Sequence, residues 1–177
     1  SELTLGRWAA ALELYRQSED AFRRIGNTEY LSLVASRRAD LLHDVGYSSE
    51  AWRSLRLALE TLPQFHESIR KGAALLGAQR IAVEDGLPRT GLACLLEANP
   101  EEHPEMLSRP STILWYLARA RAAKSLRLKG ADALISKAES LTREITDTRA
   151  RSALDDDVTI VRGEMFGDHP TEAGLQY

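Results

Sequence analysis

The residues of this chain that could hold a metal ion are few and scattered. Asp40 and His43 lie three residues apart, so a helix would place both on one face, one turn apart. A metal site between helices needs several such carboxylates and a second pair of this kind, and we find no second pair in the sequence. The aspartates at 155 to 157 would point in three directions around a helix and could not converge on one ion. We therefore predict no metal site.

The remaining histidines and the single cysteine favour structural roles. His66, His103 and His169 lie at expected helix ends or in loops, where capping is the simpler role. Cys94 lies in an apolar stretch and is expected to be a small core residue, and a single cysteine fits a reducing compartment. The sequence has neither a phosphate-binding glycine loop nor a nucleophile elbow. We predict a protein that is not an enzyme and binds no cofactor.

A basic segment is the main charged feature of the sequence. Between residues 106 and 131 the chain has no Asp or Glu. The cations of this segment are Arg109, Arg119, Arg121, Lys124, Arg127 and Lys129. The first interpretation is a solvated or internally paired face, which the acidic residues at 101 to 105 could neutralise. An acidic protein partner and nucleic acid are the alternatives, although a net charge of -3 and a pI near 5.8 argue against nucleic acid and anionic membranes.

The elements that would position these residues are helices. Hydrophobic residues make up 44% of the chain and charged residues 28%, as in ordinary soluble proteins, while aromatic residues are only 6%. Ala, Leu and Arg are abundant, and apolar residues recur three or four positions apart, as at Leu31, Ala35, Ala39 and Leu42. No apolar run approaches the roughly 20 residues of a membrane helix. We predict an all-α, cytoplasmic protein with about eight helices, whose composition is compatible with a bacterial origin.

The expected helices follow from this periodicity and from the positions of Gly and Pro. They cover residues 7–25, 28–45, 48–62, 64–85, 88–98, 111–129, 131–145 and 148–166, and another helix starts at 169–170. The fourth carries Phe65, Ile69, Ala73, Leu76 and Val83. It also contains Gly72 and Gly77, each of which costs roughly 1 kcal/mol relative to Ala, so we expect a neighbouring backbone to approach closely there. Residues 99–110 are the one irregular connection.

Five glycines recur at a nearly constant spacing. They are Gly6, Gly46, Gly86, Gly130 and Gly167, which lie 40, 40, 44 and 37 residues apart. All but the first close an apolar, helix-like stretch, and each opens another. A repeat of helix, glycine turn and helix at this period is typical of an α-solenoid.

Aligning the chain on the first three glycines brings residues of equal size into register. Small, large and small residues stand at the fifth, ninth and twelfth positions after each glycine. They are Ala11, Tyr15 and Ser18, then Ala51, Leu55 and Ala58, then Gly91, Leu95 and Ala98. Small residues at this spacing let two helices cross closely, with a bulky residue between them. Together with Pro63 after the second set, the pattern resembles the tetratricopeptide repeat.

The resemblance extends over most of the chain, from Gly6 to about Gly167. It implies a right-handed superhelix of antiparallel helix pairs, in a variant whose repeat is about 40 rather than 34 residues long. Arg38 stands where the family has a Leu, and the register slips after Gly130. We expect residues 1–177 to form one such domain. Because the units at both ends are incomplete, we expect it to be part of a larger protein.

The resemblance also implies a function. Solenoids of this kind bind extended or helical peptides in a concave groove lined by the first helix of each pair. The polar residues expected in that groove are Ser36, Asp40, His43, Arg80, Arg121, Lys124 and Arg127. The family's grip on a C-terminal carboxylate uses Asn with Lys or Arg, and here Asp40, Arg80 and Lys124 stand at the Asn positions, which disfavours that mode.

We therefore predict a non-catalytic module that binds a protein or peptide, an acidic one included, and that regulates an effector domain of the same parent chain. The main alternative is self-association through the exposed repeat ends, as a homodimer with no groove ligand. A helical-bundle metal protein and a nucleic-acid binder are further alternatives. Trp8, Trp52 and Trp115 each lie in an amphipathic stretch, so we assign them to packing rather than recognition.

Overall fold

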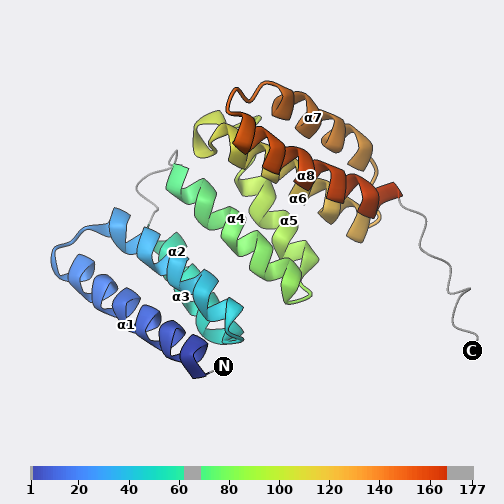
Figure 1. The fold of residues 1–177 in the computed structure, drawn as a ribbon. Helices are drawn as coiled ribbons and strands as arrows, with labels where there is room; N and C mark the ends of the chain where they lie inside the picture. The colour runs from blue at the N-terminus through green and yellow to red at the C-terminus, as the bar shows by residue number, and fades with distance from the viewer. Residues whose placement is uncertain (1, 62–68, 167–177) are drawn as a thin grey trace, which may run out of the picture. The chain divides into compact units, whose positions relative to one another are not determined.

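The computed structural model describes residues 2–61 and 69–166 (Figure 1). Over this part of the chain the fold is all-helical with eight α-helices, which confirms the predicted class and number. The helices are α1 (Glu2–Arg24), α2 (Thr28–Asp44), α3 (Ser48–Glu60), α4 (Ile69–Glu84), α5 (Pro88–Glu97), α6 (Arg109–Ser125), α7 (Ala131–Arg143) and α8 (Thr148–Phe166), with a short 3-10 helix, η1 (Pro104–Met106), between α5 and α6. The predictions for Pro63, Phe65, His66, Gly167 and the helix start at 169–170 lie outside the described residues.

Glycine turns join the helices of three adjacent pairs, α2 with α3, α4 with α5 and α6 with α7. Gly46, Gly86 and Gly130 have φ angles of 89°, 74° and 95°, a left-handed conformation in which any other residue would be strained. These three turns confirm that Gly46, Gly86 and Gly130 join helices, as predicted. The expectation for Gly6 is wrong, because Gly6 lies inside α1, which begins at Glu2 and not at Arg7. The Glu and Leu residues around Gly6 favour helix and outweigh one glycine.

The chain divides into two compact units, residues 1–108 (unit 1) and 109–177 (unit 2). In unit 1, α2 packs against α1, α3 and α4, and α4 packs against α5 and η1. In unit 2, α6, α7 and α8 all pack against one another. Because α3 also contacts α4, each unit contains a helix pair whose two members both contact the next helix, α4 or α8. The right-handed superhelix stays a prediction.

The core of unit 1 forms where the predicted small and large residues meet. Ala51, Leu55 and Ala58 of α3 are 0 to 1% exposed, and in and just after α5 Gly91, Leu95 and Ala98 are also buried. A cluster of these α3 residues with Ala39 and Leu42 of α2 and Ala78 and Ile81 of α4 forms the interior. In unit 2 the corresponding helix α7 buries Ile135, Ala138 and Thr142. The predicted pattern is thus a packing pattern in α3 and α5, whereas its first set, Ala11, Tyr15 and Ser18 of α1, is only half-buried.

The connection between α5 and α6 packs tightly on α4. Met106 and Leu107 are 1% and 6% exposed, and a Cβ atom added to Gly72 would lie 2.1 Å from the Met106 carbonyl oxygen. This confirms the close backbone approach predicted at Gly72. At Gly77 the prediction of a backbone neighbour is wrong, since the nearest atoms are the side-chain oxygens of Asp40 and Ser36, at 3.5 and 4.0 Å from a Cβ placed there.

Candidate functional site

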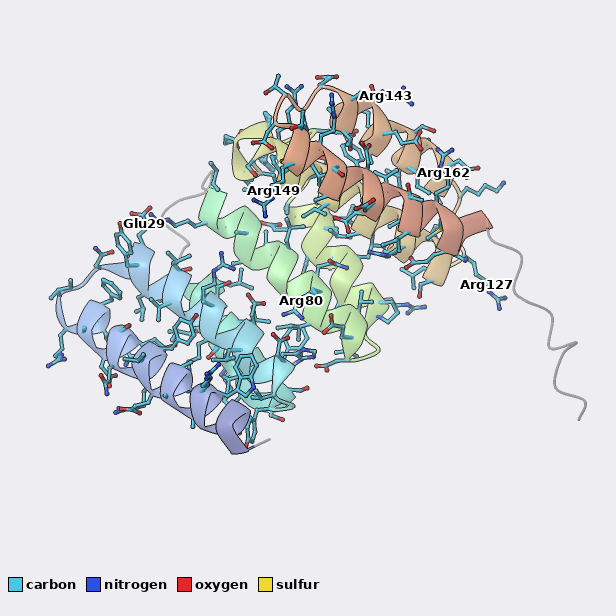
Figure 2. The ribbon with its side chains drawn as sticks, in the orientation of Figure 1. Glu29, Arg80, Arg127, Arg143, Arg149 and Arg162 are labelled. Atoms are coloured by element: carbon cyan, nitrogen blue, oxygen red, sulfur yellow. The ribbon has the colours of Figure 1, made fainter. Side chains whose placement is uncertain are left out.

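The first group of predicted groove residues lies along the contact between α2 and α4. Arg80 of α4 donates to the Asp40 carboxylate of α2 at 3.0 Å, and its other terminal nitrogen lies 3.3 Å from Asp44 and 3.2 Å from Glu84 (Figure 2). The Arg80 side chain is 39% exposed, so it forms a partly solvated link among three acids. The structure therefore brings Asp40 and Arg80 together as a charge pair between two helices.

His43 belongs to a second network at the same contact. One oxygen of the Asp85 carboxylate accepts from Trp52 Nε1 at 2.7 Å, while the other lies 3.1 Å from both the Ser48 hydroxyl and His43 Nε2. The other ring nitrogen, Nδ1, is 3.1 Å from a carboxylate oxygen of Glu84. Hydrogen bonds from Trp52, His43 and Ser48 lower the pKa of Asp85. Asp85 thus joins α2, α3 and α4, and Trp52 serves packing, as predicted.

Ser36 completes this contact. It is half-buried on α2 and lies opposite Gly77, whose missing side chain lets α4 approach. Ser36, Asp40, His43 and Arg80 therefore share one seam between the first helices of two pairs. Sequence reasoning missed Asp85, because its partners come from two helices, α2 and α3, that lie far from it in the sequence.

The basic segment is largely paired within unit 2. The Arg121 guanidinium donates two hydrogen bonds to the Glu164 carboxylate of α8, at 2.7 and 3.0 Å, and Lys124 donates to the Glu164 carbonyl oxygen. Arg109 pairs with Glu144. Glu144 and Glu164 thus neutralise part of the segment from within unit 2, because α7 and α8 pack beside α6. The hydrogen bonds from Arg121 lower the pKa of Glu164.

Two other cations of the segment differ from the expectation. Arg127 lies beyond the end of α6, which stops at Ser125 rather than at 129, and has a left-handed φ of 55°. Among the described residues Arg127 has no ion pair, and it is exposed (Figure 2). Arg119 lies over the ring of the fully buried Trp115, 4.9 Å from its centroid, a cation–π contact.

An apolar stripe along α4 is exposed. Ile69, Ala73, Leu76 and Val83 lie on one face by their spacing, and Ile69 and Val83 are 59% and 42% exposed. Ala73 is exposed and Leu76 is half-buried. The buried residues of α4 form another set, namely Gly72, Ala74, Leu75, Ala78, Ile81 and Ala82. The sequence identifies both sets as apolar but does not tell which of them faces the core.

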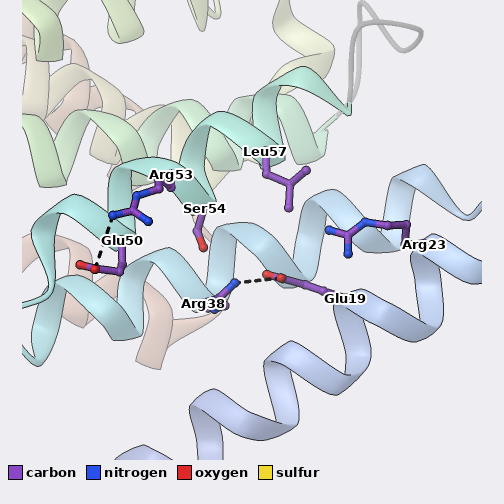
Figure 3. Close-up of a pocket in the computed structure, with 7 residues that line it drawn as sticks. All are labelled: Glu19, Arg23, Arg38, Glu50, Arg53, Ser54 and Leu57. Atoms are coloured by element: carbon purple, nitrogen blue, oxygen red, sulfur yellow. Dashed lines mark hydrogen bonds and ion pairs between the residues drawn. The ribbon is translucent and has the colours of Figure 1, made fainter.

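A polar cavity lies beside α1, α2 and α3. It has a volume of about 240 Å³ and is lined by Glu19 and Arg23 of α1, Arg38 of α2, and Glu50, Arg53, Ser54 and Leu57 of α3 (Figure 3). Arg38 donates to one oxygen of the Glu19 carboxylate at 2.9 Å. Arg38, which stands where the resembled family has a Leu, is therefore the partner of a buried acid.

The described residues contain no cluster of three or more metal-ligating side chains. Burial raises the pKa of the Cys94 thiol, which opposes formation of a reactive thiolate. In the described part of the chain, none of the helices has the length and apolar character to cross a bilayer.

Comparisons with protein-family models, with curated proteins and with solved structures give no match for this chain. The resemblance to tetratricopeptide repeats stays a prediction.

Proposed function

We propose that the chain is a non-catalytic interaction module that binds a peptide segment of a partner protein on the exposed face of α4 and α2. The observation that carries the proposal is the apolar stripe of Ile69, Ala73, Leu76 and Val83. Single exposed apolar residues are common, but a row of them along one face marks an interaction surface. Covering such a row gains about 25 cal/mol per Å² of apolar surface.

The seam beside the stripe supports this surface. Arg80 and Asp85 hold α4 against α2 through side-chain bonds, so the face is presented on a rigid support. The Arg37 side chain of α2 is 65% exposed. Its ion pair among the described residues is a weak one, with Nη1 lying 4.0 Å from Asp40 Oδ2. A bound segment with apolar side chains for the stripe and an acidic residue near Arg37 fits both features.

The same proposal covers the setting of the module. We propose that it acts in the cytoplasm, which the single cysteine supports, and that it regulates an effector domain of a longer parent chain. Arg121 and Lys124 of α6 are already bonded to Glu164, so they offer little positive charge for the phosphates of a nucleic acid.

Peptides selected from a displayed random library on the intact protein test this surface. We expect Ala73→Glu to lower the affinity of the protein for the selected peptides roughly tenfold or more, because the added carboxylate would be buried in the interface without a partner. Ala93→Glu is the matched control, since Ala93 is exposed on α5 of the same pair. Fluorescence anisotropy measures both affinities. Equal binding to the two variants, or failure to select any peptide, would contradict the proposal.

Self-association through α1 is a second candidate function. Among the described side chains of α1 only Glu19 is buried, whereas Trp8 and Leu14 are 37% and 63% exposed. Light scattering over a concentration series tests it. A dimer that Leu14→Lys dissociates would support self-association, and a strict monomer at high concentration would exclude it.

A further inference from the structure

Helix α1 buries little apolar surface where it docks. Within the described residues it packs chiefly on α2. Its inner face consists of residues spaced three or four apart, namely Leu12, Tyr15, Glu19 and Phe22, and the three apolar ones are only half-buried. Because burial of apolar surface is the main force that docks a helix, α1 should open locally more easily than α2 and α3 do.

The most buried residue of this inner face is an acid. Glu19 is 4% exposed, and Arg38 of α2 donates to one oxygen of its carboxylate at 2.9 Å (Figure 3). The other oxygen, Oε1, is buried and has no hydrogen-bond partner among the described residues. An incompletely bonded carboxylate thus stands where a docking face ordinarily carries an apolar side chain, so the burial of its charge opposes docking.

We propose that α1 is a detachable helix, which docks weakly on α2 while Glu19 is ionised and docks more tightly when Glu19 is protonated. Detachment returns the carboxylate to water and so removes the cost of burying its charge. Protonation removes the charge itself, so the docked helix loses less by burying the side chain. The switch depends on α1, which takes no part in the peptide-binding face, so it goes beyond that proposal.

The surroundings of Glu19 set the direction of the pH effect. Burial, opposed by Arg38, raises the pKa of Glu19. The docked helix therefore takes up the proton at a higher pH than the detached helix does, and docking strengthens as the pH falls through the raised pKa toward the ordinary carboxyl value of about 4. The charged and titratable groups on the elements around Glu19 are Asp20 and Arg23 on α1, Arg38 on α2, and Glu50 and Arg53 on α3.

Amide hydrogen exchange of the intact protein, followed by nuclear magnetic resonance, tests this switch. The ratio of the intrinsic exchange rate of an amide to its measured rate gives its protection and removes the direct effect of pH on exchange. At neutral pH we expect the amides of α1 to be less protected than those of α2 and α3. We expect the protection of α1 to rise several-fold as the pH falls from neutral to mildly acidic, because the docked helix takes up a proton at Glu19.

Glu19→Gln should raise the protection of α1 on the order of tenfold at neutral pH and remove its pH dependence, because the amide resembles the protonated acid and keeps an acceptor for Arg38. Glu13→Gln is the matched control, since it removes the same charge from an exposed side chain that bonds only to Arg16 and Gln17 of α1 itself. We expect it to leave α1 no better protected and the pH dependence intact.

Three results would each overturn the proposal. The first is equal protection of α1 and α2 in the parent protein, which would mean that α1 opens only together with the rest of unit 1. The second is a protection of α1 that does not change with pH. The third is a Glu19→Gln variant whose α1 is no better protected than that of the Glu13→Gln variant.

Discussion

Replacing Gly72 with alanine is expected to destabilise the fold by about 2 to 3 kcal/mol, a typical cost of overpacking. The new Cβ would lie 2.1 Å from the Met106 carbonyl oxygen and 2.8 Å from Leu107 Cδ2. The closest obstacle is backbone, and both residues are buried, so the connection between α5 and α6 must move away from α4. The gain in helix propensity, about 1 kcal/mol, offsets only part of this cost.

Gly77→Ala is the control for this prediction, because it makes the same change in the same helix. Its Cβ would meet Asp40 Oδ1 at 3.5 Å, an ordinary contact. We expect this variant to be neutral or to gain up to about 1 kcal/mol. Urea denaturation followed by circular dichroism measures both midpoints. If the two variants unfolded at the same urea concentration, the close packing of residues 106 and 107 on α4 would be refuted.

Replacing Asp85 with asparagine is expected to lower the melting temperature by several degrees. The carboxylate accepts from Trp52, Ser48 and His43, and an amide presents one acceptor oxygen and one donor nitrogen in its place. One or two of these donors would lose their partner at the junction of α2, α3 and α4. Asp156→Asn on α8 is the control, because Asp156 is exposed. A melting temperature equal to that of the control would show that the network contributes nothing.

The same residue makes the fold sensitive to acid. Because hydrogen bonds lower the pKa of Asp85 in the folded state, its contribution is present above the ordinary carboxyl pKa near 4 and is lost as the pH falls through the lower folded value. Glu19 has the opposite effect on acid stability. Because its pKa is raised in the folded state, the folded protein takes up this proton at a higher pH than the unfolded chain does. Unfolding monitored by tryptophan fluorescence between neutral and acidic pH should therefore show a smaller acid loss in Asp85→Asn than in the parent. An identical loss in both would contradict this assignment.

Residues close in the sequence determined the parts of the structure that were predicted. The glycines at 46, 86 and 130 end helices through their own backbone conformation, and the alternation of Ala51, Leu55 and Ala58 acts within one helix. Such signals need no knowledge of distant residues. Gly6 shows their limit, since a glycine flanked by good helix formers does not end a helix.

The candidate sites depend on contacts between residues far apart in the sequence. Arg121 meets Glu164, and Asp85 meets His43 and Trp52, only because separate helices pack side by side. The charge run could be found in the sequence, but its partners could not, because several acids were available to it. The cavity at Glu19 likewise requires three helices, and no local pattern marks it.

By itself, the sequence determined that this protein is a set of helix pairs turned at glycines, because helix propensity, periodicity and left-handed turns are properties of neighbouring residues. Only the tertiary structure decided which apolar face of α4 is buried and which is left exposed. Both faces of α4 are apolar enough to enter a core, so hydrophobicity alone cannot choose between them. The choice is made by where α2, α5 and η1 pack, and that packing leaves Ile69, Ala73 and Val83 exposed.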